Sequence, residues 1–171
     1  MCVLIYKPKG LRMPDKSVLK ACFEANPHGA GFATTKGVHH SMNFQGVYRM
    51  LCQIPKEEPC IIHFRLATTG SICLRNCHPF KNGNVYFAHN GVLSIPTKDD
   101  MTDSETAFKW LYPTILKYGL DSKELDNKVK QIIGYSKFAF LCGEKIKLYG
   151  EFRQINGVYY SNLRWRNYMN I

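Results

Sequence analysis

The chain has 171 residues, of which 45% are hydrophobic and 21% charged, an ordinary balance for a globular protein of one domain. This balance excludes a disordered chain, which combines low hydrophobicity with high charge. No run of about 18 apolar residues occurs and the first residues lack a signal-peptide pattern, so we expect no membrane span and no secretion. Seven cysteines at irregular spacings argue against a disulfide framework, and together these features predict a cytoplasmic protein.

The first half of the chain predicts short strands and helices, because apolar runs and helical spacing are separated by Pro and Gly turns. The expected elements are a strand over 2–6, a helix from Asp15 or Ser17 to Ala25, a hairpin over 28–35 completed by a short strand, a helix over 43–54 and a buried strand over 59–67.

The second half predicts two adjacent helices between strands, which indicates a layered α+β fold rather than strict βαβ alternation. Pro113 falls inside the first of these helices and can kink it. Neither a repeat nor a linker divides the chain, so we expect a single domain over residues 1–171. The expected elements are a polar loop over 68–81, a strand over 84–89, a helix capped by Thr102 or Asp103, a helix over 122–133 and strands over 137–141, 145–149 and 158–161.

Cys2 is the first candidate catalytic residue. Removal of Met1 would leave a thiol and a free α-amine on one residue, and an α-amine has a pKa of about 8, so part of it is unprotonated at neutral pH. The amine can take the thiol proton, directly or through water, which pairs a nucleophile with its own base. The alternative is a buried strand cysteine, and position alone favours that interpretation.

Arg65 and Asp103 are candidates for binding a free amino acid. Arg65 follows a buried strand, where a charge is costly unless it is paired, and its planar guanidinium suits a carboxylate. Asp103 opens a helix and could bind an ammonium group. A structural salt bridge at Arg65 and a plain helix cap at Asp103 are the alternatives.

His89-Asn90-Gly91 ends a predicted strand. An Asn-Gly pair is common in tight turns, which is one interpretation of this segment. The other is an oxyanion hole, in which the Asn90 side-chain amide and the Gly91 backbone N–H stabilise one developing O⁻; such a donor is worth about 3 kcal/mol in the transition state.

Together and in this order, these segments resemble the glutaminase domain of class II glutamine amidotransferases. That family includes amidophosphoribosyltransferase, asparagine synthetase of the B type, glutamate synthase and glucosamine-6-phosphate synthase. The resemblance covers about residues 2–108. Its motifs are Cys2, Asn-Pro-His-Gly-Ala-Gly-Phe at 26–32, Arg-Leu-Ala-Thr at 65–68, His78-Pro79, His89-Asn90-Gly91 and Thr-Asp-Ser-Glu at 102–105.

The resemblance implies a four-layer αββα Ntn-hydrolase sandwich with antiparallel sheets. We expect neither a cofactor nor a bound metal. It implies that Cys2 attacks the glutamine side-chain amide and that Asn90 and Gly91 hold the oxyanion. The implied substrate-binding residues are Arg65 for the carboxylate, Asp103 for the amine, and Thr68, Thr69 and His89 near them. The loop from Leu66 to Phe80 corresponds to the segment that closes over glutamine.

The chain departs from the family at three positions. Val3 follows the nucleophile where Gly is frequent, Leu66 follows Arg65 where Trp is common, and Thr69 stands where His is common. The last departure alters part of the expected carboxylate contact.

The fate of the ammonia stays open at this point. Family members carry a second domain that consumes it, and about 65 residues after Asp103 are too few for one. The chain could be a subunit that passes ammonia to a separate synthase partner, a stand-alone amidohydrolase acting on glutamine or another small amide, or a non-catalytic glutamine-binding protein; we favour the first.

The net charge of +10 adds a weaker hypothesis. A basic surface can bind nucleic acid, an acidic protein or anionic metabolites, or it can be solvated surface without a partner. Residues 164–168 mix cations with aromatics as single-strand nucleic-acid binders do. A terminal segment packed by Trp165 is the alternative, and we favour it.

Overall fold

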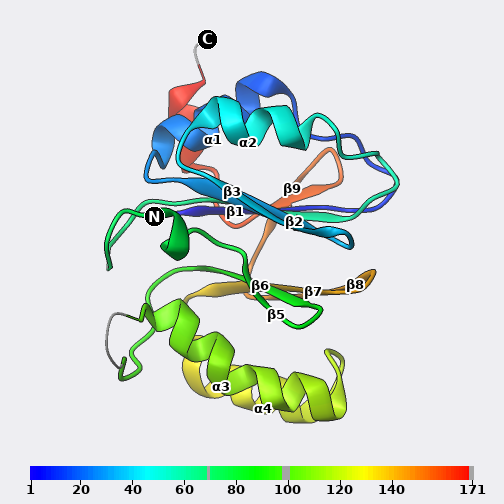
Figure 1. The fold of residues 1–171 in the computed structure, drawn as a ribbon, viewed down its shortest axis with the longest axis vertical. Coiled ribbons are helices and arrows are strands. Elements are labelled where there is room, and N and C mark those ends of the chain that lie inside the picture. Colours follow the sequence, from blue (N-terminus) through cyan, green and yellow to red (C-terminus); the bar gives the residue numbers. More distant parts are fainter. Residues whose placement is uncertain (69, 98–100, 170–171) are drawn as a thin grey trace.

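The protein has four layers, with two antiparallel sheets face to face and a pair of helices on each outer side (Figure 1). The computed structural model describes residues 1–68, 70–97 and 101–169. The expected αββα sandwich is confirmed, and its two helices from the second half of the chain lie together on one outer side.

The larger sheet has six strands. They are β1 (Val3–Lys7), β2 (Ala30–Thr34), β3 (Gly37–Ser41), β4 (Cys60–Phe64), β9 (Arg153–Ile155) and β10 (Val158–Tyr160), and the helices on this side are α1 (Lys16–Ala25) and α2 (Phe44–Leu51). The strand order is β3-β2-β4-β1-β10-β9, so the strand after Cys2 lies in the sheet interior, between β4 and β10.

The smaller sheet has four strands. They are β5 (Phe80–Asn82), β6 (Val85–Asn90), β7 (Lys137–Cys142) and β8 (Lys145–Tyr149), and helices α3 (Asp103–Tyr118) and α4 (Lys123–Ile132) cover its outer face. Its order is β5-β6-β7-β8. Two short 3₁₀ helices, η1 (Leu74–Asn76) and η2 (Arg164–Tyr168), lie outside the sheets.

Alternation along the strands divides the core into three parts. In β1, Val3 and Ile5 pack under the helices, whereas Leu4 packs between the sheets. In β6, Phe87 packs against α3 and α4, whereas Ala88 packs between the sheets. Side chains in a strand alternate with a period of two, so Cys2 shares the face of Leu4 and Asn90 shares the face of Ala88. Both therefore face the space between the sheets.

The helix starts follow the expected capping chemistry with one exception. Thr102 accepts the N–H of Glu105 at 3.2 Å and begins α3, and Ser122 does the same for α4. Asp15 precedes α1 but makes no side-chain cap. α3 continues through Pro113, which lies on its exposed side, where water can bond the carbonyl that proline leaves without a partner.

Several features were not predicted from the sequence. Helix η1 and the start of strand β5 fall in what was expected to be a polar loop over 68–81. Strand β9 and helix η2 were not predicted, although Trp165 in η2 is buried and packs on Tyr160 with ring centroids 5.4 Å apart, as the packed-terminus interpretation expected. Lys7 is fully buried, and its Nζ donates to the carbonyls of Pro8, Leu11 and Lys56 at 2.9–3.1 Å. These bonds satisfy an ammonium group that would otherwise be too costly to bury.

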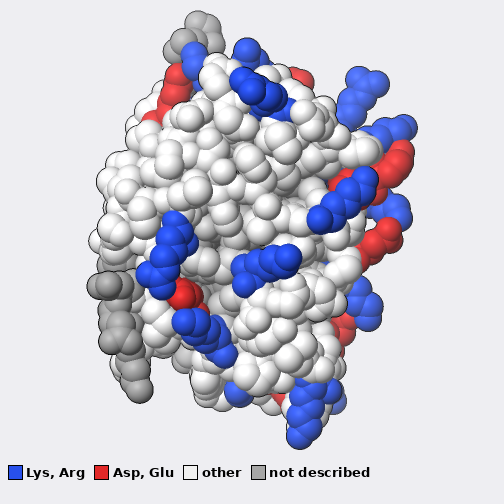
Figure 2. Space-filling model, in the orientation of Figure 1, with Lys and Arg blue, Asp and Glu red and all other residues white. Residues whose placement is uncertain are grey.

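The basic residues are dispersed on the face drawn in Figure 2, where several lie beside Asp or Glu and no single cluster forms. Pairs such as Lys9 with Glu144 at 3.0 Å are exposed to solvent. Among the described residues no helix is both long and apolar enough to cross a bilayer.

Candidate functional site

Four chain segments meet at one end of the two sheets. β4 runs antiparallel to β1, so Phe64, at the end of β4, lies opposite Val3 at the start of β1. The end of β10 reaches the same place, where the N–H of Ser161 donates to the carbonyl of Leu4 at 2.8 Å. β6 in the other sheet ends at Asn90. Strand pairing therefore brings the segments of Cys2 and Arg65 together, and the packing of the second sheet on the first brings Asn90 to them, where its Nδ2 donates to Ser161 Oγ at 2.7 Å.

Cys2 accepts hydrogen bonds at both its side chain and its backbone carbonyl. The N–H of Leu66 donates to its Sγ at 3.3 Å, and Asn162 Nδ2 donates to its carbonyl at 2.8 Å. Burial raises the pKa of the Cys2 thiol, against the opposing effects of the Leu66 N–H, the terminal ammonium and Arg65. The thiol is therefore neutral at physiological pH, and its use as a nucleophile requires a base.

Met1 determines whether that base exists. While Met1 is attached, the nitrogen of Cys2 is an amide and cannot accept a proton. Met1 is 48% exposed, and its removal would place a free amine beside the thiol.

The two expected oxyanion donors differ in their surroundings. Asn90 is buried, and its Nδ2 donates to Ser161 Oγ at 2.7 Å. Gly91 lies at φ 144°, where a Cβ would meet Ser136 Oγ at 2.1 Å. Glycine is required here, because the backbone conformation and the close approach of Ser136 both exclude a side chain.

The expected carboxylate and amine binders lie at the same end of the sheets. Arg65 is buried, and its Nη1 donates to the carbonyl of Ser71 at 2.9 Å. The Asp103 carboxylate, at the start of α3, accepts the N–H groups of Leu93 and Ser104, each at 2.8 Å. These bonds fix the direction of the carboxylate while leaving it further lone pairs for an ammonium group.

A small cavity brings most of the expected residues together. It is lined, among others, by Cys2, Arg65, Thr68, His89, Gly91 and Asp103. Asn90 is not among its lining residues, and Thr69 lies outside the described residues. The cavity measures about 30 Å³. A water molecule needs roughly 10–15 Å³ of such space, so an amino acid requires the lining to move.

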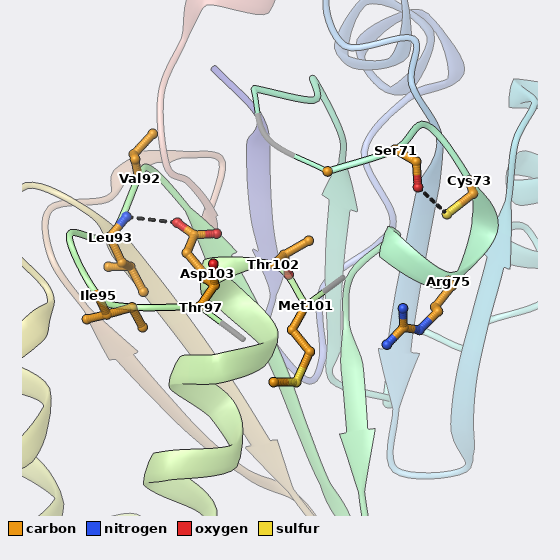
Figure 3. A pocket seen from close by; sticks show the side chains of 11 residues that line it. Ser71, Cys73, Arg75, Val92, Leu93, Ile95, Thr97, Met101, Thr102 and Asp103 are labelled. Carbon is orange, nitrogen blue, oxygen red and sulfur yellow. Dashed lines mark hydrogen bonds between the residues drawn. The ribbon is translucent and has the colours of Figure 1, made fainter. Parts of the chain in front are cut away.

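A larger pocket of about 780 Å³ adjoins this cavity and shares Thr102 and Asp103 with it. Figure 3 shows that it lies between the loop that carries Ser71, Cys73 and Arg75 and the segment that carries Val92, Leu93 and Ile95, with Asp103 bonded to Leu93 at its wall. The expected amine-binding carboxylate is therefore reached from an open pocket.

Three buried histidines form the floor of the small cavity. The rings of His63 and His78 lie 4.3 Å apart, and His89 bonds Ser104 Oγ through Nδ1 at 2.7 Å. Burial lowers the pKa of His63 to about 3 and that of His89 to about 4, and it holds the pKa of His78 well below 6.5. Within the described part of the chain, both ring nitrogens of His63 and Nε2 of His89 have no hydrogen-bond partner, which agrees with neutral rings.

The motif at 26–32 holds the segment that follows β4 through hydrogen bonds. His28 Nδ1 accepts the N–H of Ala67 at 3.0 Å, and the backbone of Arg65 pairs with residues 28 and 29 at 2.8–3.0 Å. A Cβ on Gly31 would lie 2.4 Å from the carbonyl of His78. The glycines of this motif therefore allow Cys77 and His78 of the loop over 66–80 to pack closely against strand β2 and the residue before it.

Sequence reasoning missed several residues of the site. His28 and His78 stood inside quoted motifs, and their polar side chains beside glycine and proline were the available signal. His63 lay in an apolar strand, and Ser161 and Asn162 follow a late strand with no distinguishing pattern. Ser161 and Asn162 reach the site because β10 pairs with β1. The hydrogen bond from Asn162 to Cys2, for example, joins residues 160 positions apart in the chain.

The comparisons with known proteins agree with this arrangement. A sequence model described as glutamine amidotransferases class-II matches residues 40–142. The chain belongs to this family. The match includes the Arg65, Asn90-Gly91 and Asp103 segments, whereas Cys2 and Ser161 lie outside it.

A curated amidotransferase relative is the probable glutamine amidotransferase DUG3 of Saccharomyces cerevisiae, which is 32% identical over 44% of this chain and 26% of its own length. The glutamine phosphoribosylpyrophosphate amidotransferase of B. subtilis has a similar fold, with a TM-score of 0.62 at 17% identity. A structure described as the allosteric regulatory enzyme of purine biosynthesis also has a similar fold, with a TM-score of 0.59 at 16% sequence identity. Each structural match covers 94% of this chain and 41% of the other, so the chain spans less than half of these relatives.

The buried histidines predict a loss of stability in mild acid. In the unfolded chain the pKa of these histidines is about 6.5, whereas in the folded protein that of His63 is about 3 and that of His89 about 4. Their contribution to the free energy of unfolding is therefore fully present above pH 6.5. It falls as the pH drops below 6.5, because the unfolded state takes up protons that the folded state excludes until pH 3–4. Each histidine contributes about 1.4 kcal/mol per pH unit in this window. Urea unfolding between pH 8 and pH 4 measures the slope.

A matched pair of variants separates this effect from general acid sensitivity. His63→Leu should flatten the decline, because it removes one of the three groups, whereas His39→Leu on the partly exposed strand β3 should follow the wild-type curve. Equal curves for the two variants would contradict the assignment.

Gly91→Ala should disrupt the end of β6. The added Cβ would meet Ser136 Oγ at 2.1 Å and would force a positive φ on alanine, so we expect a loss of roughly 2–4 kcal/mol in the free energy of unfolding. Chemical denaturation measures this loss. Gly143→Ala is the control, because it also has a positive φ but open space around its Cβ, and its loss should be smaller.

Proposed function

We propose that the protein hydrolyses the side-chain amide of glutamine to glutamate and ammonia, with Cys2 as the nucleophile after removal of Met1. The single observation that carries this proposal is the cavity shared by Cys2, Gly91, Arg65 and Asp103. It combines a thiol, an oxyanion donor, a cation for a carboxylate and an anion for an ammonium group. Membership in the class II glutamine amidotransferases supports glutamine as the substrate.

The chemistry begins with proton transfer within Cys2. The free amine takes the thiol proton, and the thiolate attacks the amide carbon while Asn90 Nδ2 and the Gly91 N–H stabilise the oxyanion. The C–N bond then breaks, and the amine returns its proton to the departing ammonia. Water attacks the resulting thioester on Cys2, glutamate leaves and the thiol is restored. The raised pKa of Cys2 fits a thiol that is deprotonated during the reaction rather than beforehand.

Arg65 and Asp103, which line the same cavity as Cys2, are assigned to recognition of the substrate. Arg65 would bind the α-carboxylate beside Thr68, and Asp103 would bind the α-amine. His89 supports the start of α3 through its hydrogen bond to Ser104. The small volume of the cavity requires an opening step, and the loop 66–80 is the segment whose movement would admit glutamine.

The ammonia would pass to a separate synthase partner. The proteins of similar fold are more than twice as long as the matched part, so a glutaminase unit accompanied by another unit is the arrangement that this proposal favours. A stand-alone amidohydrolase and a non-catalytic glutamine-binding protein are the alternatives. Activity that rises on addition of the partner supports the first, and binding without turnover by processed protein supports the last.

Cys2→Ala should abolish turnover without abolishing binding. Alanine after Met1 still permits removal of the methionine, so the variant loses the thiol alone, and glutamate release should fall by at least about 10⁴-fold. Intact mass should confirm the loss of one methionine in both proteins. Cys52→Ala is the control, because Cys52 is an exposed cysteine at the end of α2. Retained activity in Cys2→Ala would end the proposal.

Asp103→Asn should weaken substrate binding. The amide keeps the shape and can still accept an N–H, but it loses the charge that would pair with the α-amine, so KM for glutamine should rise about 10–100-fold with a smaller change in kcat. Glu105→Gln, in the same turn of α3, removes a charge that pairs with Arg75 and Lys109 instead. An equal rise in KM for both variants would show that net charge, not Asp103, is responsible.

A further inference from the structure

Ser161 connects the two sheets at the point where the proposed nucleophile and oxyanion donor meet. Its Oγ accepts the N–H of Leu4 at 2.9 Å and lies 2.7 Å from Asn90 Nδ2. Its own N–H donates to the carbonyl of Leu4. Leu4 is two residues from Cys2 in β1, and Asn90 ends β6 of the facing sheet. One buried hydroxyl therefore sets the position of the Asn90 side chain relative to the strand of Cys2.

We propose that Ser161 is a positioning residue that orients the Asn90 amide, so that its Nδ2 faces the oxyanion when the thioester forms. This inference rests on the proposed function, because it assigns a role in the same reaction. Ser161 lies outside the residues matched by the family model and carries no motif of its own.

Counting donors and acceptors shows why an orienting group is needed. With Nδ2 on Ser161, the Oδ1 of Asn90 is buried and has no hydrogen-bond partner among the residues that the structure describes. The Ser161 hydroxyl, which accepts from Leu4, still has a proton to donate. A half-turn of the amide about its Cβ–Cγ bond exchanges its two ends. Ser161 then donates to Oδ1, the unpaired carbonyl is satisfied, and both N–H groups of Nδ2 are released.

The hydroxyl is suited to this role because it can accept in one orientation and donate in the other. In both orientations it keeps the bond from Leu4, so the distance between β1 and Asn90 is preserved while the amide turns. Released N–H groups in a buried site are costly without an acceptor, and a developing oxyanion supplies that acceptor. The developing oxyanion thus favours the orientation in which Ser161 donates to Asn90 Oδ1.

The experiment compares Ser161→Ala with Ser161→Thr in the processed protein. Ser161→Ala should lower kcat for glutamine hydrolysis about 10–100-fold, with KM within about twofold of wild type. Ser161→Thr keeps the hydroxyl and should recover most of kcat. Ser122→Ala is the control for lost stability, because it removes a hydroxyl that caps α4 away from the site.

A double variant tests whether Ser161 acts through Asn90. In an Asn90→Ala background, Ser161→Ala should have no further effect on kcat, because the group that it orients is absent. A full additional loss in the double variant would overturn the inference, as would wild-type kcat in Ser161→Ala or a folded Ser161→Thr that recovers nothing.

A readout independent of turnover separates this inference from the proposed function. The side-chain amide protons of Asn90 can be observed by NMR in ¹⁵N-labelled protein, and they should exchange slowly in wild type and rapidly in Ser161→Ala. If processed wild type does not hydrolyse glutamine, the proposed function fails, and this exchange difference alone decides whether Ser161 holds the amide. Equal exchange in the two proteins would overturn the inference.

Discussion

Antiparallel pairing of β1 with both β4 and β10 is the constraint on which the site depends. Because Val3 lies opposite Phe64 and Ile5 opposite Tyr160, the start of β1 lies beside the ends of both neighbours. The period of two then directs the polar side chains at these ends toward the space between the sheets. A slip of one residue in either pairing would turn Cys2 away from the facing sheet and would break its contact with Leu66.

The same space holds polar groups at a cost to stability. Neither ring nitrogen of His63, nor Oδ1 of Asn90, has a hydrogen-bond partner among residues 1–68, 70–97 and 101–169. Such groups are rare in a folded core, and they are found where a site is prepared for a ligand or a charge that arrives later. The position of His63 in the cavity of Cys2 fits the proposed reaction, in which negative charge develops on the substrate beside Gly91. Large apolar clusters on both outer sides of the sheets offset this cost.

The family match and the structure identify different residues of the proposed site. The class II glutamine amidotransferase match covers the Arg65, Asn90 and Asp103 segments, and the structure adds Cys2 and Ser161 from outside that match. The relatives extend well beyond the part that this chain matches. The pocket beside Asp103 gives the proposed substrate site an open side.

The sequence by itself determined most strands and helices, the family resemblance and the candidate residues, because apolar periodicity, caps and motif order are local properties. It predicted β4 and α3 from their apolar patterns, and it placed Arg65 and Asp103 at their ends. Only the tertiary structure decided the roles of His63, Ser161 and Asn162 and the burial of Lys7. Those roles arise from pairing between strands far apart in the chain, and the hydrogen bonds that satisfy a buried polar group are set by whichever backbone the fold places beside it.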